Sequence, residues 1–247
     1  MASDSDIRIE LVDQPDDIVQ GFECLCATFG RQTHDGIFKA MNPGWDTPEG
    51  HAAGAQRMID RWQAAKRTAG GDLSTIFLKA TVPDAKSPGG RVVGGLAIWL
   101  QASVVPGHGE APAEDLSQVM DLEAVYPGDK DEQRYLVQLD RSLHGRRIEL
   151  VKAKAGASPP AVMVLDLCIV HPEHQGKGLG RRLVQWGLDE AERRGGLEAV
   201  TEASSMGRRQ YEKLGFKGVL PEIEYVVDAQ WEGRSRPSNL FMRTRPE

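Results

Sequence analysis

The chain has 247 residues, 40% of them hydrophobic and 27% charged, and this composition excludes a largely disordered protein. The formal net charge of −6 argues against nucleic acid as the main partner, because phosphate backbones are bound by basic surfaces. An acidic chain is compatible with a cationic amine substrate, and equally with an ordinary acidic protein that has no such substrate.

The sequence shows no feature of a secreted or membrane-bound protein. No stretch approaches the ~20 apolar residues of a membrane span, and residues 1–10 lack the basic-then-apolar order of a signal peptide. Cys24, Cys26 and Cys168 are too few and odd in number for a disulfide framework. We therefore expect a cytoplasmic protein, with the nucleus as the alternative, that binds no membrane and is a monomer or a homodimer.

The first hundred residues predict alternating strands and helices. Residues 30–50 are rich in Gly, Pro and Asn and predict an ordered loop, which either roofs a pocket or connects elements at the surface. Apolar periodicity and turn signals predict the elements around this loop, namely strands at 7–12, 74–82 and 91–101 and helices at about 16–29 and 51–69.

Residues 102–160 have the weakest patterns in the chain. Ala113 to Val125 is compatible with a helix, and Gln133 to Gly145 has leucines at a helical spacing. Residues 155–160 predict a linker to the next strand. Nearly 60 residues separate the third and fourth predicted strands.

Beyond residue 216, the pattern predicts strands at 217–219, 224–227 and 239–243.

The apolar run from Val162 to Val170 predicts a buried strand, with Leu165, Leu167 and Ile169 facing one way and Val164, Asp166, Cys168 and Val170 the other. A glycine-rich loop, Gln175 to Gly180, follows and leads directly into an amphipathic helix over 180–194. Such a loop binds phosphate, because glycines allow close approach and the helix N-terminus presents unpaired N–H groups. Its spacing matches neither the G-x-G-x-x-G dinucleotide fingerprint nor the P-loop.

The glycine spacing instead fits Gln175-x-x-Gly178-x-Gly180, and the segment ends in Tyr211-Glu212-Lys213-Leu214-Gly215-Phe216. Over residues 161–216 this arrangement resembles the GNAT superfamily of acyl-CoA N-acyltransferases. The resemblance implies one domain over 1–247 with an α/β (α+β) fold. Its mixed, mostly antiparallel sheet would be splayed between the fourth and fifth strands, with helices on both faces. Residues 102–160 would be an insertion near the acceptor site.

The resemblance also implies which residues bind coenzyme A. Backbone groups of the splayed strand would bind pantetheine, the loop would hold the pyrophosphate, and Ser204 stands where many family members carry a contacting Asn. The residues implied in this way are Cys168, Ile169, Val170, Gln175, Gly176, Lys177, Gly178, Leu179, Gly180, Arg181 and Ser204.

Three residues are candidates for catalysis. The resemblance places Tyr211 beside the acetyl thioester, where a phenol donates a proton to the leaving thiolate; the alternative is a packing aromatic. Asp166, in an apolar strand, and Glu202 are candidate general bases. The alternative for each is a carboxylate that is paired with Arg or Lys or exposed in the cleft. Cys168 is expected to pack in the strand rather than act as a nucleophile.

The sequence predicts no metal site. Cys24-x-Cys26 is too closely spaced for a zinc pair, and His171 and His174 have no evident third ligand. The expected reaction is direct transfer of acetyl from acetyl-CoA to the primary amine of a small molecule. The alternatives are a protein lysine or N-terminal acetyltransferase, and a non-catalytic acyl-CoA-binding module.

Overall fold

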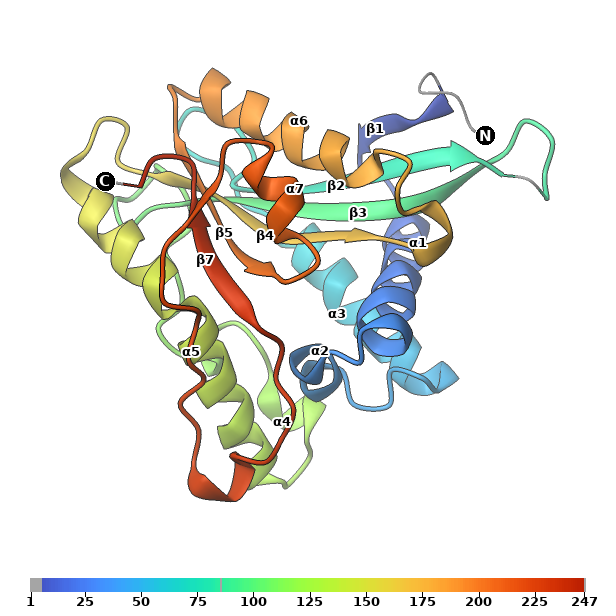
Figure 1. Ribbon diagram of the computed structural model, residues 1–247, viewed down its shortest axis with the longest axis horizontal. Helices are drawn as coiled ribbons and strands as arrows, with labels where there is room; N and C mark the ends of the chain where they lie inside the picture. Colours follow the sequence, from blue (N-terminus) through green and yellow to red (C-terminus); the bar gives the residue numbers. More distant parts are fainter. Residues whose placement is uncertain (1–5, 85, 247) are drawn as a thin grey trace.

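The computed structural model describes residues 6–84 and 86–246, which are organised around one seven-stranded sheet (Figure 1). The strand order is β1-β2-β3-β4-β5-β7-β6, and only the β4–β5 pair is parallel. The strands are β1 (Arg8–Leu11), β2 (Thr75–Pro83), β3 (Arg91–Ala102), β4 (Val162–Val170), β5 (Glu198–Ser204), β6 (Lys217–Gly218) and β7 (Asn239–Arg243).

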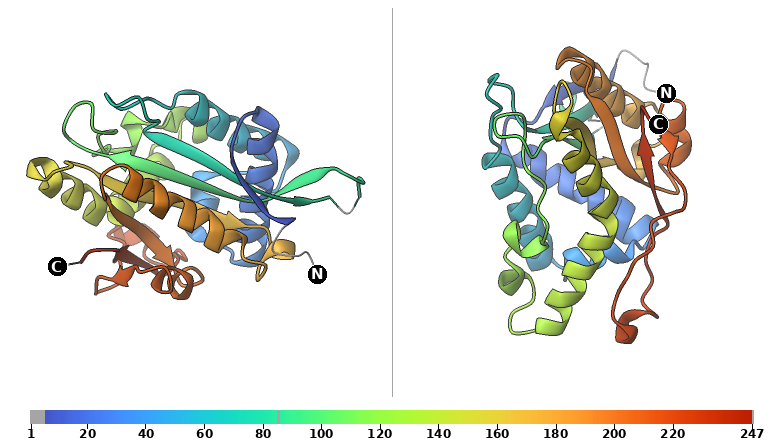
Figure 2. Two further views of the ribbon diagram at one scale, coloured as in Figure 1. Left: turned by 90° about the horizontal axis from the view of Figure 1, so that it is seen from above. Right: turned by 90° about the vertical axis from the view of Figure 1, so that its left-hand side faces the viewer.

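Helices cover both faces of the sheet (Figure 2). One face is packed by α6 (Leu179–Arg193) and α7 (Arg208–Glu212). The other is packed by α1 (Pro15–Leu25) and α3 (Pro48–Gln63) at one end and α5 (Lys130–Ala153) at the other. The expected fold class is confirmed. Nowhere in the described parts of the chain is a helix both long and apolar enough to cross a membrane.

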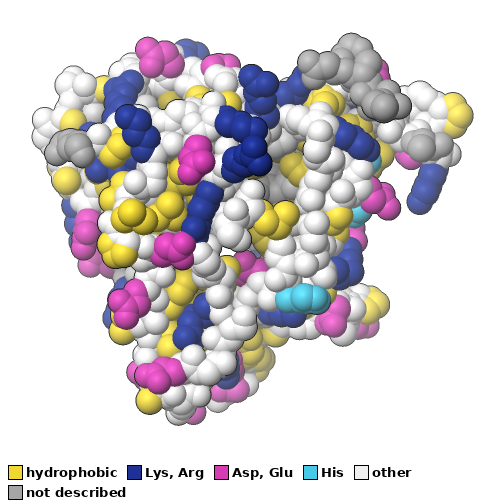
Figure 3. Space-filling view, viewed as in Figure 1, with side chains coloured by type: hydrophobic (Ala, Val, Ile, Leu, Met, Phe, Trp, Pro, Cys, Tyr) yellow, Lys and Arg dark blue, Asp and Glu magenta, His cyan; other side chains and the backbone are white. Residues whose placement is uncertain are grey.

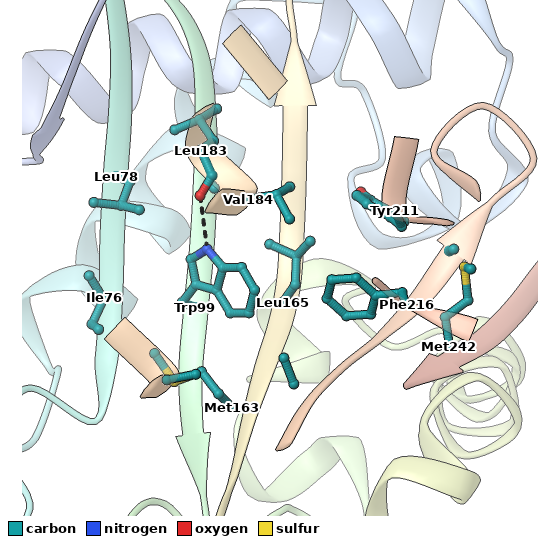
Figure 4. Packing of buried hydrophobic residues seen from close by; sticks show 14 of the residues in the cluster. Ile76, Leu78, Trp99, Met163, Leu165, Leu183, Val184, Tyr211, Phe216 and Met242 are labelled. Carbon is teal, nitrogen blue, oxygen red and sulfur yellow. Dashed lines mark hydrogen bonds between the residues drawn. The ribbon is translucent and has the colours of Figure 1, made fainter. Parts of the chain in front are cut away.

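The largest apolar cluster lies between the sheet and α6 (Figure 4). The Trp99 indole is fully buried there and donates a hydrogen bond to the Leu183 carbonyl at 3.3 Å. Gly187 permits this packing, because a Cβ at that position would lie 1.9 Å from the indole. The apolar stripe predicted for this helix is confirmed, since Leu179, Leu183, Gly187 and Ala191 are all buried.

A bulge at Asp166 changes which residues of β4 share a face. Ile98 pairs with Leu167 and Trp99 with Leu165, so Asp166 has no partner of its own on β3. Leu165 packs under α6, whereas Leu167 packs with the helices on the opposite face. The predicted alternation over 164–170 is therefore wrong, because one extra residue reverses the side-chain directions that follow it.

The parallel pairing of β4 with β5 is short. It joins Val162–Leu165 to Glu198–Thr201, and the Thr201 hydroxyl donates to the Leu165 carbonyl at 2.9 Å. Beyond this point the two strands are no longer paired and the sheet is splayed (Figure 1). The far ends of both strands are thereby left free to line a site.

The predicted loop at 30–50 contains ordered helical structure. The first helix continues as a π-helix over Cys26–Gln32, and α2 (Gly36–Met41) follows within the predicted loop. The next helix begins three residues earlier than predicted, at Pro48, where the Thr47 hydroxyl caps it by accepting from the Gly50 N–H at 3.1 Å, and it ends at Gln63.

Two other predicted elements are corrected. The possible helix at 113–125 is only a 3-10 turn, Leu116–Gln118, and the single-turn helix α4 (Leu122–Val125). Residues 224–227 form no strand, although their pattern predicted one. They lie along α5, where the Val226 N–H donates to the Ser142 hydroxyl at 3.0 Å, so a side chain replaces the missing strand partner.

Candidate active site

A cavity of about 580 Å³ lies where β4 and β5 separate. Its walls come from the end of β4, the loop before α6, the β5–α7 turn, the segment from the π-helix to α2, and Ser235–Ser238. In Figure 3 this face of the molecule is hollowed near its middle, and Lys and Arg side chains gather along the upper rim, over α6 and α7. The cavity therefore joins the glycine-rich loop to two segments distant in sequence.

The loop before α6 has the geometry of an anion cradle. Gly176 and Gly178 have φ of 73° and 91°, a left-handed conformation that favours glycine. Gly178 precedes the first residue of α6, whose first N–H groups have no acceptor within the helix. Arg181 adds positive charge from the first turn and lines the cavity. These features fit a pyrophosphate, because the helix dipole and the free N–H groups favour negative charge there.

Most of the residues implied to bind coenzyme A line the cavity. They are Cys168, Ile169, Val170, Gln175, Gly176, Gly178, Leu179, Gly180, Arg181 and Ser204. Lys177 is outside this lining, and its ammonium donates to the Glu173 carbonyl at 2.7 Å.

The Val170 carbonyl is already occupied by protein groups. It accepts from the Thr28 hydroxyl at 2.9 Å and from Gln175 Nε2 at 3.1 Å. The Gln175 amide also exchanges hydrogen bonds with the Gln32 amide. Gln175 thus ties the loop to the π-helix, and both lone pairs of this carbonyl are used within the protein.

Tyr211 lines the cavity, and its hydroxyl interacts with the Cys168 thiol. Burial and Cys168 raise the pKa of Tyr211 well above its ordinary value, so the phenol stays protonated at neutral pH. Burial also raises the pKa of Cys168 to about 12, which keeps the thiol protonated and weakly nucleophilic. Gly207 makes room for the ring, since a Cβ there would lie 2.7 Å from it.

Asp166 and Glu202 are joined by one arginine. Arg147, on α5, donates from Nη1 to Asp166 Oδ1 at 2.5 Å and from Nε to Glu202 Oε1 at 3.1 Å, and its Nη2 bonds Glu202 Oε2. Arg61 donates to the other oxygen of Asp166 at 2.7 Å. Burial pushes the pKa of Asp166 upward, but the two arginines outweigh it and hold the pKa well below its ordinary value.

Neither carboxylate lines the cavity, and both have the ion-paired environment that was the alternative to a catalytic base. Sequence reasoning missed Arg147. The available signal was its position in line with the leucine stripe, just past the end of the predicted helix at 133–145: Arg147 comes four residues after Leu143 and eight after Leu139. An arginine on an apolar stripe indicates a buried partner of opposite charge.

The cavity is bridged by a close backbone contact. A Cβ on Gly36 would lie 1.9 Å from the Ser235 carbonyl oxygen, so the start of α2 and the segment before β7 touch. Segment 102–160 supports this bridge from behind, where Tyr135 packs on Trp231. Within residues 6–84 and 86–246, no side chain from that segment lines the cavity itself.

Glu173 lies with His171 and His174 beside the cradle, their possible ligand atoms within 4.8 Å of one another. These two histidines therefore have a third candidate ligand, which the sequence pattern did not indicate. Cys24 and Cys26 are buried free thiols, and burial raises the pKa of each to about 12.

Residues 134–218 match the sequence profile of the acetyltransferase (GNAT) domain. Comparison with curated protein sequences gives no match. Three similar solved structures each align with 96% of this chain. The first is a Drosophila melanogaster polyamine N-acetyltransferase, with a TM-score of 0.57, 12% identity and 98% of that chain covered. The second is a mosquito arylalkylamine N-acetyltransferase-like 5b, with a TM-score of 0.55, 16% identity and 98% of that chain covered. The third is Aedes aegypti arylalkylamine N-acetyltransferase 2, with a TM-score of 0.54, 18% identity and 97% of that chain covered.

The structural similarities, all at low identity, concern the fold, and the profile match covers the cradle, Tyr211 and Arg147. The profile match and the splayed sheet agree with the resemblance seen in the motif at 161–216. Together they give residues 134–218 a match to the GNAT acetyltransferase domain and the whole chain a GNAT-like fold.

Proposed function

We propose that this protein transfers acetyl from acetyl-CoA directly to the primary amine of a small molecule. The observation that carries the proposal is the single cavity joining the anion cradle, Tyr211 and the space beneath the Gly36–Ser235 contact. The acyl donor and the amine would then bind in the same cavity. Holding both there turns a reaction between two separate molecules into a reaction within one complex.

Each wall of the cavity has a part in this proposal. The start of α6 and Arg181 bind the pyrophosphate. The free edge of β4 at Cys168 and Ile169 binds pantetheine as an added strand would. The Val170 carbonyl contributes less, because Thr28 and Gln175 already occupy it.

The chemical step needs one proton donor and one proton acceptor. The uncharged amine attacks the thioester carbonyl, a C–N bond forms and the C–S bond breaks. Tyr211, kept protonated by burial, gives its proton to the departing thiolate. Asp166 and Glu202 remain the candidate acceptors for the amine proton. Neither lines the cavity, so the proton would reach them through water, and ion pairing with Arg147 weakens both as bases.

The bridged cavity favours a small molecule over a peptide. A peptide acceptor runs through a groove that is open at both ends, and the contact of Gly36 with Ser235 obstructs such a path. The names of the three similar solved structures, which are small-amine acetyltransferases, agree with this choice.

The test is release of CoA thiol from acetyl-CoA across a panel of amines that includes polyamines, arylalkylamines, aminoglycosides, amino acids and a lysine peptide. We expect turnover of one class of small amines, and a fall in kcat of roughly 100-fold or more in Tyr211→Phe. Tyr126→Phe is the matched control, because its hydroxyl bonds the Ala40 carbonyl away from the cavity.

Other results would redirect the proposal. Turnover of the lysine peptide alone would favour a protein acetyltransferase. Tight CoA binding without turnover of any amine would favour the binding module. If Tyr211→Phe and Tyr126→Phe behaved alike in an active enzyme, Tyr211 would be a packing residue.

A further inference from the structure

Asp35 is the one carboxylate among the described residues that line the cavity. The π-helix ends at Gln32, and His34 adopts a left-handed φ of 51°, so the chain turns sharply before α2. The Asp35 N–H is held by the Phe29 carbonyl at 2.8 Å, which fixes the residue at the start of α2. The carboxylate therefore stands at a defined place in the cavity wall.

Only one oxygen of this carboxylate is used by the protein. Oδ1 caps α2 by accepting from the Ile37 and Phe38 N–H groups, both at 2.9 Å. Across residues 6–84 and 86–246 the structure records no hydrogen bond or ion pair to Oδ2. Capping requires an acceptor oxygen, which asparagine supplies equally well. The charge and the second oxygen thus have no structural task.

In the described chain, none of the surrounding cations forms an ion pair with this carboxylate. Lys39 is the cation that acts on Asp35 most, but it forms no ion pair with it within 4.0 Å in the described chain. Arg236 also lines the cavity, but its guanidinium donates to the carbonyls of Trp231 and Glu232 at 2.9 and 3.0 Å. Arg181 belongs to the anion cradle at the start of α6.

Asp35 and Tyr211 belong to different walls of the cavity. Asp35 directly precedes α2 and Tyr211 lies on α7, and Figure 1 shows these two helices apart. The nitrogen that attacks the thioester must be uncharged, whereas a carboxylate binds a cationic donor more strongly than a neutral one. A nitrogen bound as a cation at Asp35 cannot attack at the same time, so the two walls suit two different nitrogens of one acceptor.

We propose that Asp35 binds a second, cationic group of the acceptor, and that the preferred substrates are short diamines or amines with another positive charge at the far end. This inference rests on the proposed acetyl transfer and specifies its substrate class. It makes Asp35 a specificity residue that binds the acceptor away from the reacting atoms. A charge-assisted hydrogen bond in a partly buried cavity is the source of the selectivity.

The experiment compares butane-, pentane- and hexane-diamine with butyl-, pentyl- and hexylamine, each with wild type and Asp35→Asn. Asparagine keeps the cap and removes the charge. We expect kcat/KM for the best diamine to fall roughly 10- to 100-fold, mainly through KM, with that of the matched monoamine changing little. Asp189→Asn, an exposed carboxylate on α6 outside the cavity, controls for the change in net charge.

Calorimetric titration of the same diamine into the protein–CoA complex gives a readout that does not need turnover. Weaker diamine binding in Asp35→Asn than in Asp189→Asn supports the inference even if no amine is acetylated, and only the proposed reaction then fails. The inference is overturned if Asp35→Asn weakens diamine and monoamine equally, or weakens neither, in kcat/KM and in binding affinity. It is also overturned if the wild type binds the diamine no more tightly than the monoamine.

Discussion

Replacing Arg147 by methionine tests the ion-paired cluster at the base of the splayed strands. The Arg147 side chain is 8% exposed and bridges Asp166, 14% exposed, to Glu202, 4% exposed. Methionine fills much of the same volume without charge. Glu202 is then left without its arginine in a buried position, while Asp166 retains Arg61.

The expected loss is large. Removing one partner of a buried ion pair costs about 3–5 kcal/mol of unfolding free energy, because the remaining charge is uncompensated. For a chain of this size the melting temperature should fall by roughly 6–20 °C, at about 2–4 °C per kcal/mol. Arg141→Met on the same helix is the matched control, because Arg141 is 66% exposed and lies 3.6 Å from Asp115. That exposed pair should contribute less than about 1 kcal/mol.

The assay is urea unfolding of wild type and both variants, followed by circular dichroism, with calorimetric melting as a second measurement. Adding Asp166→Asn and Glu202→Gln to Arg147→Met should restore part of the loss, since no buried charge is then left alone. If Arg147→Met and Arg141→Met unfold at the same urea concentration, or if neutralising the two carboxylates restores nothing, the reasoning is wrong.

Two further predictions concern stability. Gly187→Ala should lower the free energy of unfolding by about 1–3 kcal/mol, because its Cβ would meet the Trp99 ring at 1.9 Å. Gly145→Ala, whose Cβ has no neighbour within 4 Å, should raise the free energy of unfolding by about 0.5–1 kcal/mol. Equal effects of the two substitutions in urea unfolding would contradict this prediction. Asp166 has a depressed folded-state pKa, so its contribution is present above its unfolded pKa of about 3.9 and is lost as the pH falls below it. The stability of wild type should therefore fall more steeply below about pH 4 than that of Asp166→Asn, and parallel curves in a pH series of urea unfolding would refute that assignment.

The local features of the site could be predicted from the sequence because they depend on residues that are neighbours in the chain. A glycine-rich loop that leads into a helix forms an anion cradle through its backbone conformation alone. Gly176, Gly178 and Arg181 all line the cavity at this loop, as the sequence predicts. The stripe of α6 was likewise predictable, since its period of 3.6 residues is a property of any helix.

Other features depend on contacts between distant segments, and the sequence pattern does not record them. The bulge at Asp166 arises from the register of β4 against β3, and it reverses the faces that simple alternation predicts. Residues 224–227 have side chains typical of a strand, but no strand lies beside them. Side chains of α5 accept hydrogen bonds from the backbone of this region instead.

The sequence by itself therefore determined the anion cradle of the cavity, because the cradle is made by one continuous stretch of chain. Only the tertiary structure decided the rest of the cavity. Packing of α5 against the sheet brings Arg147 to Asp166 and Glu202 across 19 and 55 residues of sequence. The contact of Gly36 with Ser235, segments at opposite ends of the chain, bridges the cavity that Asp35 lines. Such juxtapositions have no signal in local pattern, because they exist only once the sheet has formed.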